Sequence, residues 1–249
     1  MTVEWLWVHG WALGPGLWRG VTRRLSGSRH HLIDLGFFGP AKAVLPQAVP
    51  WVGVGHSLGF LWLIRQLAVD PEHRKNCLGL VSVNGFARFT RGEGFSAGVS
   101  PRIPAAMRAR CGTDPDGLLR DFRIKAGLPA DLGPVAVPGM DRERLALGLD
   151  WLAEWDVRGF LAAWDRPLLA LACDGDRVVT PAITRASFEA TGRQVHWYAD
   201  SGHLLPLIRP AWCAERIAAF QQILMDEGSL NPYGGDNGTA HESHRDAEP

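Results

Sequence analysis

Short apolar runs alternate with stretches of helical spacing along most of the chain. The apolar runs are typical of buried strands, and they lie at 4–8, 31–35, 51–54, 78–83, 167–173 and 194–198. Helical spacing is found over 15–26, over 61–68, from 181 onward and over 210–225. Strands that alternate with helices pair in parallel through right-handed crossovers. We therefore expect an α/β fold with a mostly parallel sheet flanked by helices, and a functional site at the carboxyl ends of its strands.

The strand pattern stops between residues 86 and 164, where only helical segments remain. These segments cover 103–110, 117–126 and 141–153. We interpret 86–164 as a helical cap inserted between two parts of the α/β core, which span 1–85 and 165–227. The tail, 228–249, has almost no apolar residue, and we expect it to be disordered and assign it no function.

Composition and charge exclude several classes of protein. The 249 residues are 46% hydrophobic and carry a formal net charge of zero, so no overall field attracts nucleic acid or an anionic membrane. The chain has neither the pattern of a signal peptide nor an apolar run long enough to span a bilayer. Its four cysteines show no spacing typical of a zinc site or of a disulfide framework. We expect a cytoplasmic monomer without metal or cofactor.

The stretch Gly55–Gly59, Gly-His-Ser-Leu-Gly, lies where a strand passes into a helix. Such a turn holds a serine on a strained backbone, so that its hydroxyl stands clear and the next amide is free to bind an oxyanion. The two glycines leave room for the helix to pass close to the strand. The pattern also occurs by chance, but its position favours Ser57 as a nucleophile and the Leu58 N–H as an oxyanion donor.

A serine hydroxyl needs an imidazole to take its proton and a carboxylate to orient that imidazole. Asp174 and Asp176 follow one late strand and His203 follows the next, in the order that this kind of fold uses. We favour Asp176, because Asp174 lies nearer the strand and is better placed to form a turn.

Four histidines compete for the role of base. His196 lies within a strand, His56 within the serine turn and His9 at the end of the first strand, whereas His203 follows a glycine in a loop. We therefore favour His203.

His9-Gly10-Trp11 follows the first strand and supplies a second glycine turn. The Trp11 N–H can stand beside the Leu58 N–H, and two amides aimed at one oxyanion lower a barrier by several kcal/mol, about 3 for each donor. We expect the Trp11 side chain to line the acyl pocket, and His9 to hydrogen-bond within the loop.

The serine turn, the His-Gly-Trp turn, Asp176 and Gly202-His203 together resemble the α/β-hydrolase superfamily. Within it, the chain is similar to the biotin-pathway esterases that cleave pimeloyl-acyl-carrier-protein methyl ester. Further segments carry this second resemblance, namely 9–13 with Trp18, 33–39, 118–122, 148–152 and 156–158. Such hydrolases usually have two more strands before the His-Gly turn, so we expect the N-terminal strands to be missing or shortened. His56 stands where the biotin-pathway enzymes often carry tryptophan.

Between residues 88 and 125 the chain has eight basic residues against four acidic ones. The resemblance implies an acyl carrier protein as partner, and such carriers are acidic, so a basic cap surface would steer one toward the pocket. The candidates are Arg88, Arg108, Arg120 and Arg123. The alternative is an ordinary solvated helix surface in an arginine-rich chain.

These features lead us to expect a serine carboxylesterase that forms an acyl-enzyme. The resemblance implies pimeloyl-acyl-carrier-protein methyl ester as its substrate, in biotin synthesis. One alternative keeps the fold and changes the reaction to that of a general carboxylesterase, a lactonase or a C–C bond hydrolase. The other is a non-catalytic binding module that retains the pocket.

Overall fold

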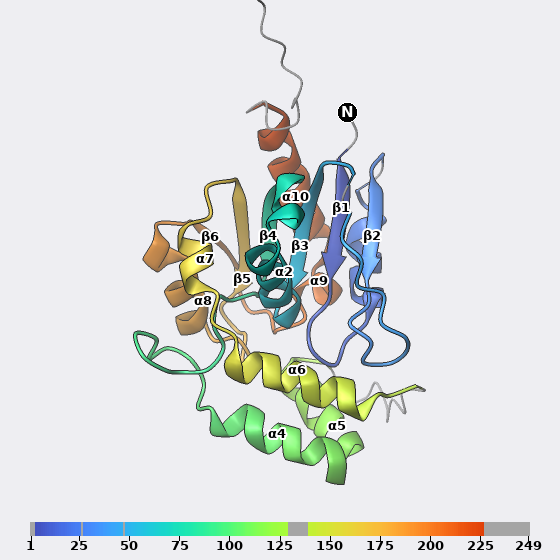
Figure 1. Ribbon diagram of the computed structural model, residues 1–249, viewed down its shortest axis with the longest axis vertical. Coiled ribbons are helices and arrows are strands. Elements are labelled where there is room, and N and C mark those ends of the chain that lie inside the picture. The colour runs from blue at the N-terminus through green and yellow to red at the C-terminus, as the bar shows by residue number, and fades with distance from the viewer. Residues whose placement is uncertain (1–2, 26, 47, 129–138, 227–249) are drawn as a thin grey trace, which may run out of the picture.

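A single sheet of six parallel strands forms the centre of the protein, in the order β2-β1-β3-β4-β5-β6 (Figure 1). The computed structural model describes residues 3–25, 27–46, 48–128 and 139–226. The strands are β1 (Glu4–Val8), β2 (Arg29–Ile33), β3 (Trp51–His56), β4 (Cys77–Val83), β5 (Leu168–Cys173) and β6 (Val195–Tyr198). The sheet agrees with the parallel α/β architecture that the alternating pattern predicts.

The central strands are buried on both faces, which explains why they read as continuous apolar runs. Every residue of β3 is buried, whereas the edge strand β2 has exposed or half-buried residues at all positions except Ile33. The second strand was expected at 31–35 and is found two residues earlier, because its pairing with β1 runs from Arg29 opposite Glu4 to Ile33 opposite Val8. The first residues of this edge strand are polar, so the pattern of apolar residues did not mark where the strand begins.

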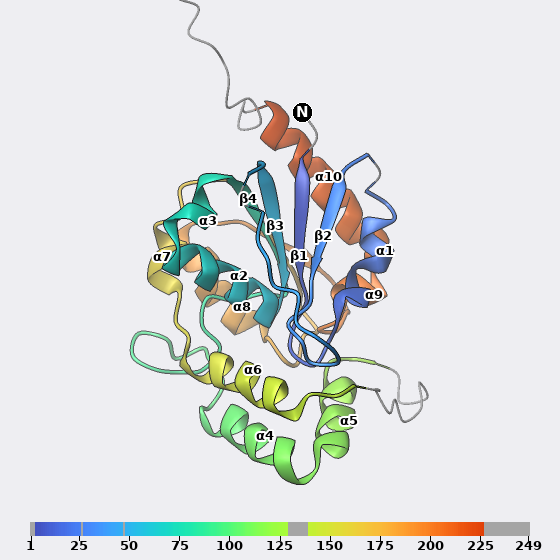
Figure 2. The same cartoon turned by 45° about the vertical axis from the view of Figure 1, so that its right-hand side comes forward.

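Helices cover the two faces of the sheet (Figure 2). The first face holds α1 (Arg19–Thr22), α9 (Leu205–Ile208) and α10 (Pro210–Asp226), and the second holds α2 (Leu58–Val69), α3 (Pro71–Lys75), α7 (Arg158–Ala162) and α8 (Pro181–Ser187). On the first face Trp5, Trp7 and Trp18 are fully buried and pack with residues of α10. Most of the many tryptophans are therefore explained by the core and not by a ligand pocket.

Three further helices lie beyond the carboxyl ends of the strands (Figure 1). They are α4 (Arg102–Thr113), α5 (Pro115–Lys125) and α6 (Arg142–Glu154), and α4 packs against α6. This is where the sequence predicts a cap. The expected range 86–164 also includes α7, which packs against α2 beside the sheet. The residues 129–138 within that range, and the tail 228–249, lie outside the described residues.

The strand order reverses at β1, because β2 lies on one side of it and β3 on the other. Ligands of open α/β sheets bind in the crevice at the carboxyl ends of the strands where the order reverses. The loops after β1 and β3, at residues 9–11 and 57–58, open into this crevice. Within the described residues, β1 is the first strand of the sheet.

No helix in the described part of the chain combines the length and the apolar character needed to cross a membrane.

The turn between β3 and α2 has no room for side chains at its two glycines. A Cβ on Gly55 would meet the backbone of Phe60, and a Cβ on Gly59 would meet the carbonyl oxygens of Val8 and His9. The structure thus agrees with the steric role that the sequence predicts for these glycines, and it shows that Gly59 brings α2 against the end of β1.

We expect Gly59→Ala to lower the free energy of unfolding by about 2–4 kcal/mol, because the new methyl group can only be accommodated by moving backbone. Urea denaturation measures the change. Gly112→Ala is the matched control: nothing lies within 4 Å of a Cβ there, and alanine in α4 should stabilise the protein by about 0.5–1 kcal/mol. Similar effects of the two substitutions would contradict the close approach at Gly59.

Candidate active site

Ser57 occupies the strained position between β3 and α2. Its backbone has φ 53° and ψ −124°, in the region of positive φ that residues other than glycine rarely adopt. Hydrogen bonds hold this conformation, since Ser57 N donates to Val83 O at 3.1 Å and Ser57 O accepts from Phe60 N at 3.0 Å. Strain that is held in this way is common at functional sites.

His203 lies against the Ser57 hydroxyl. Its Nε2 is 2.9 Å from Ser57 Oγ, across a separation of 146 residues in the chain. The imidazole is almost completely buried, with 1% of its residue surface exposed. Of the four histidines that the sequence offered as a base, His203 is the one hydrogen-bonded to this hydroxyl.

Asp176 lies on the other side of the imidazole. Its Oδ2 is 2.7 Å from His203 Nδ1, and its Oδ1 accepts hydrogen bonds from Val178 N and Val179 N at 2.7 and 2.9 Å. Both carboxylate oxygens therefore have partners, which fixes the carboxylate in its plane. Asp174 is exposed, lies in the turn that follows β5, and accepts from Asp200 N at 2.8 Å.

His9 and His56 are buried and serve the surrounding loops. His9 Nδ1 is 2.9 Å from Gly10 O, and His9 Nε2 accepts from Leu35 N at 3.0 Å. Burial, and then the charge of the nearby His203, hold the pKa of His56 well below its usual value. His56 is therefore a neutral ring that donates from Nε2 to the carbonyl oxygen of His203 at 2.8 Å.

Asn84 directly follows β4, and the sequence alone assigns it no role in the site. Its Nδ2 donates to His203 O at 2.8 Å, so this carbonyl is held by Asn84 and by His56 together. Asn84 has φ 47°, a conformation that asparagine tolerates better than most residues. The Asn-Gly pair after a buried strand is the signal in the sequence that could have indicated it.

The turn after β1 lies beside the serine. A Cβ on Gly10 would be 3.1 Å from Ser57 Cβ, so only glycine lets the chain pass this close. Leu58 is the first residue of α2, and the amide at that position has no acceptor within its helix. The Trp11 side chain donates from Nε1 to Leu145 O of α6 at 2.8 Å and packs edge to face against Phe122 of α5.

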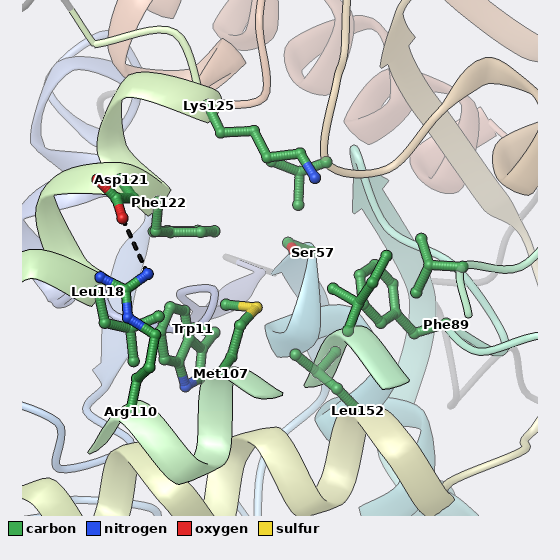
Figure 3. A pocket seen from close by; sticks show the side chains of 13 residues that line it. Trp11, Ser57, Phe89, Met107, Arg110, Leu118, Asp121, Phe122, Lys125 and Leu152 are labelled. Carbon is green, nitrogen blue, oxygen red and sulfur yellow. Dashed lines mark hydrogen bonds and ion pairs between the residues drawn. The ribbon is translucent and has the colours of Figure 1, made fainter. Parts of the chain in front are cut away.

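A cavity of about 240 Å³ opens above Ser57 between the sheet and helices α4, α5 and α6 (Figure 3). Most of its lining is apolar, and Trp11 is the one tryptophan among the described residues that contributes to it. The lining consists of Trp11, Ser57, Phe89, Val99, Ile103, Met107, Arg110, Leu118, Asp121, Phe122, Lys125, Leu152 and Val178. The cavity suits an acyl chain whose carbonyl reaches Ser57.

The four candidate arginines differ in their surroundings. Arg88 pairs with Asp156 at 2.6 Å, and Arg108 pairs with Asp150 at 2.6 Å. Burial lowers the pKa of Arg123. Arg120 is exposed and takes part in none of the ion pairs found within the described ranges. The structure therefore does not bring the four together as one open basic surface.

In the part of the chain that the structure describes, no three histidine, cysteine, aspartate or glutamate side chains are grouped so that they could hold a metal ion. All four cysteines are buried and unpaired.

We expect Asn84→Ala to lower the free energy of unfolding by about 2–4 kcal/mol. The substitution removes a buried donor from His203 O and forces alanine into a left-handed backbone conformation. Ser82→Ala on the same strand is the control, because the Ser82 hydroxyl is buried without a partner. Thermal and urea denaturation measure both variants. An Asn84→Ala variant as stable as Ser82→Ala would contradict the role assigned to the amide.

Comparison with known proteins shows what this arrangement resembles. No family model matches the chain. The pimeloyl-(acyl-carrier protein) methyl ester esterase of Stenotrophomonas maltophilia strain K279a is 29% identical over 221 residues, which cover 79% of this chain and 84% of that protein.

Two solved structures share the fold at low sequence identity. An esterase from Exiguobacterium antarcticum has a TM-score of 0.77 at 16% identity, and the enol-lactonase from Burkholderia xenovorans LB400 has a TM-score of 0.71 at 15% identity. Each match covers 89% of this chain and 92% of the other. The chain therefore has the α/β-hydrolase fold and resembles the pimeloyl-(acyl-carrier protein) methyl ester esterases in sequence.

Proposed function

We propose that this protein is a serine carboxylesterase that works through an acyl-enzyme. The observation that carries the proposal is the unbroken set of contacts from Asp176 through His203 to the hydroxyl of Ser57, which opens on an apolar cavity. A buried imidazole between a carboxylate and a serine hydroxyl is the arrangement needed to activate a hydroxyl at neutral pH. It also argues against a binding module that has lost catalysis.

The first half of the reaction forms the acyl-enzyme. Ser57 Oγ attacks the ester carbonyl carbon while its proton moves to His203 Nε2, and the carbonyl oxygen becomes an oxyanion. The Leu58 and Trp11 amides donate to that oxyanion, and Asp176 stabilises the imidazolium. When the intermediate collapses, the bond to the alcohol oxygen breaks, and the alcohol leaves with the proton from His203.

The second half returns the enzyme to its starting state. A water molecule gives a proton to His203 Nε2 and attacks the acyl carbon. The second oxyanion uses the same two amides, and its collapse restores the Ser57 hydroxyl and releases the carboxylic acid. Every group needed for both halves thus belongs to this chain.

The substrate we propose is pimeloyl-acyl-carrier-protein methyl ester, which would yield the pimeloyl thioester on its carrier and methanol. It is the substrate named for the Stenotrophomonas maltophilia relative. The apolar cavity above Ser57 suits the aliphatic chain of such an ester. An acidic carrier would meet the cap helices, where Arg120 is exposed on α5.

A general carboxylesterase or lactonase is the second candidate. Arg88 and Arg108 form ion pairs with Asp156 and Asp150. The cap therefore has fewer unpaired positive charges for an acidic carrier than the count of basic residues in the sequence suggests. Such an enzyme would use the same serine, histidine and aspartate on a free ester. Comparing carrier-linked and free methyl esters distinguishes the two.

We expect Ser57→Ala to lower kcat for a short-chain p-nitrophenyl ester by at least about 10³-fold, because the nucleophile is lost. Labelling by a fluorophosphonate should disappear in the same variant. Asp176→Asn should also reduce kcat by about 10³- to 10⁴-fold, whereas Asp174→Asn should leave kcat close to that of the wild type. Ester hydrolysis that persists in Ser57→Ala would contradict the proposed nucleophile.

We expect Arg120→Glu to lower kcat/KM for the carrier-linked methyl ester by about three- to tenfold, chiefly through slower association, and to leave free methyl esters unaffected. The difference should shrink as salt is added. Arg23→Glu is the matched control for charge reversal, because Arg23 follows α1, which packs against α10 on one face of the sheet. An equal loss in the two variants, or no loss with Arg120→Glu, would contradict carrier binding at α5.

A further inference from the structure

Three charged side chains line the cavity above Ser57, and they do not have the same surroundings. They are Arg110 from α4, and Asp121 and Lys125 from α5 (Figure 3). The rest of the lining is apolar apart from Ser57 itself. A charge on an otherwise apolar cavity wall affects which ligands can enter, so the partners of these three groups decide the selectivity of the cavity.

Arg110 and Asp121 compensate each other. Arg110 Nη1 is 2.8 Å from Asp121 Oδ2, and Arg110 Nη2 is 2.8 Å from Asp114 Oδ2. The guanidinium is thus held by two carboxylates, and these contacts raise the pKa of Arg110 and lower that of Asp114. Arg110 therefore offers no uncompensated positive charge to a ligand.

Lys125 takes part in no ion pair or hydrogen bond found within the described residues. It is the last residue of α5, where a positive charge is favourable beside the carbonyl end of the helix. Helix-end preference accounts for a basic residue there, but it does not require the side chain to turn inward. Figure 3 shows the Lys125 side chain extending from α5 to the Ser57 side of the cavity.

Ser57 and Lys125 therefore border one cavity, and apolar side chains such as Phe122 make up most of the rest of its lining. A linear ester can place its carbonyl at Ser57, its methylene chain on the apolar wall and a negative group at the ammonium. Lys125 is an exposed residue, so water screens part of the attraction between the two charges and the pair contributes modestly. A neutral ester makes the first two contacts and lacks the third.

We propose that Lys125 is a specificity-determining residue that pairs with an anionic group of the ester substrate, a carboxylate or a phosphate, which lies beyond the acyl chain from the carbonyl that Ser57 attacks. The inference rests on the proposed esterase function and names the substrate class of that site. The anion can come from two sources: the free carboxylate of a dicarboxylic acid monoester, or the phosphate on the prosthetic arm of a carrier protein.

The test compares matched anionic and neutral esters on the wild type and on Lys125→Met, which keeps the length of the side chain without its charge. One pair is monomethyl pimelate and dimethyl pimelate. The other is a methyl-ester acyl thioester of phosphopantetheine and the same thioester of pantetheine, which lacks the phosphate. We expect the ratio of kcat/KM for the anionic member to kcat/KM for the neutral member to fall by about three- to tenfold in at least one pair.

The affected pair identifies the source of the anion, since a loss with the monoester indicates a carboxylate and a loss with phosphopantetheine indicates a phosphate. Lys75→Met is the matched control, because Lys75 is an exposed lysine of α3 away from the cavity. The inference is overturned if Lys125→Met changes the anionic and neutral members equally in both pairs, or changes neither.

Binding separates a failure of this inference from a failure of the proposed function. The absence of Ser57-dependent hydrolysis with every ester would contradict the esterase proposal alone. Calorimetry with monomethyl pimelate and with the phosphopantetheine thioester on Ser57→Ala reports the ion pair without turnover. In that background, adding Lys125→Met should weaken binding of at least one of these ligands by about three- to tenfold. If the substitution leaves the affinity for each ligand unchanged, the inference is overturned.

Discussion

The close approach of α2 to the end of β1 is the constraint on which the rest of the site depends. Gly59 packs against the carbonyl oxygens of Val8 and His9, and Ser57, two residues earlier, has a strained conformation with positive φ. The same packing places the first amide of α2 and the turn after β1 side by side, next to the serine. The proposed nucleophile and its two candidate oxyanion donors thus come from one packing arrangement between a helix and two neighbouring strands.

Burial and hydrogen bonding then fix the imidazole that faces this serine. Asp176 holds one edge of the His203 ring, and His56 and Asn84 both hold the carbonyl oxygen of the same residue. Because the two donors stand at the ends of the adjacent strands β3 and β4, the sheet itself positions the histidine loop. Low pKa keeps His56 neutral, so this support carries no charge that would oppose an imidazolium on His203.

Trp11 connects the turn beside Ser57 with the helices that cover the carboxyl ends of the strands. Its backbone belongs to the turn beside Ser57, its indole donates to Leu145 of α6, and its ring packs on Phe122 of α5. The apolar cavity is therefore built on the same residue as one of the proposed oxyanion donors. We assign substrate selection to the charged residues of the cavity lining. There, two carboxylates pair with Arg110, whereas Lys125 has no carboxylate partner among the described residues.

The sequence by itself determined the alternation of strands and helices and the turn at Ser57, because both follow from patterns of neighbouring residues. It also determined the order of serine, aspartate and histidine, because each of the three directly follows a predicted strand or lies in the loop after one. It also separated Asp176 from Asp174 by position alone. Only the tertiary structure decided that Asn84 supports His203, that Arg88 and Arg108 are occupied by internal ion pairs, and that Lys125 faces the cavity. Some of these contacts join residues far apart in the chain, and others depend on the orientation of a long side chain. Packing between helices and strands determines both the contacts and the orientation, and the local sequence pattern does not.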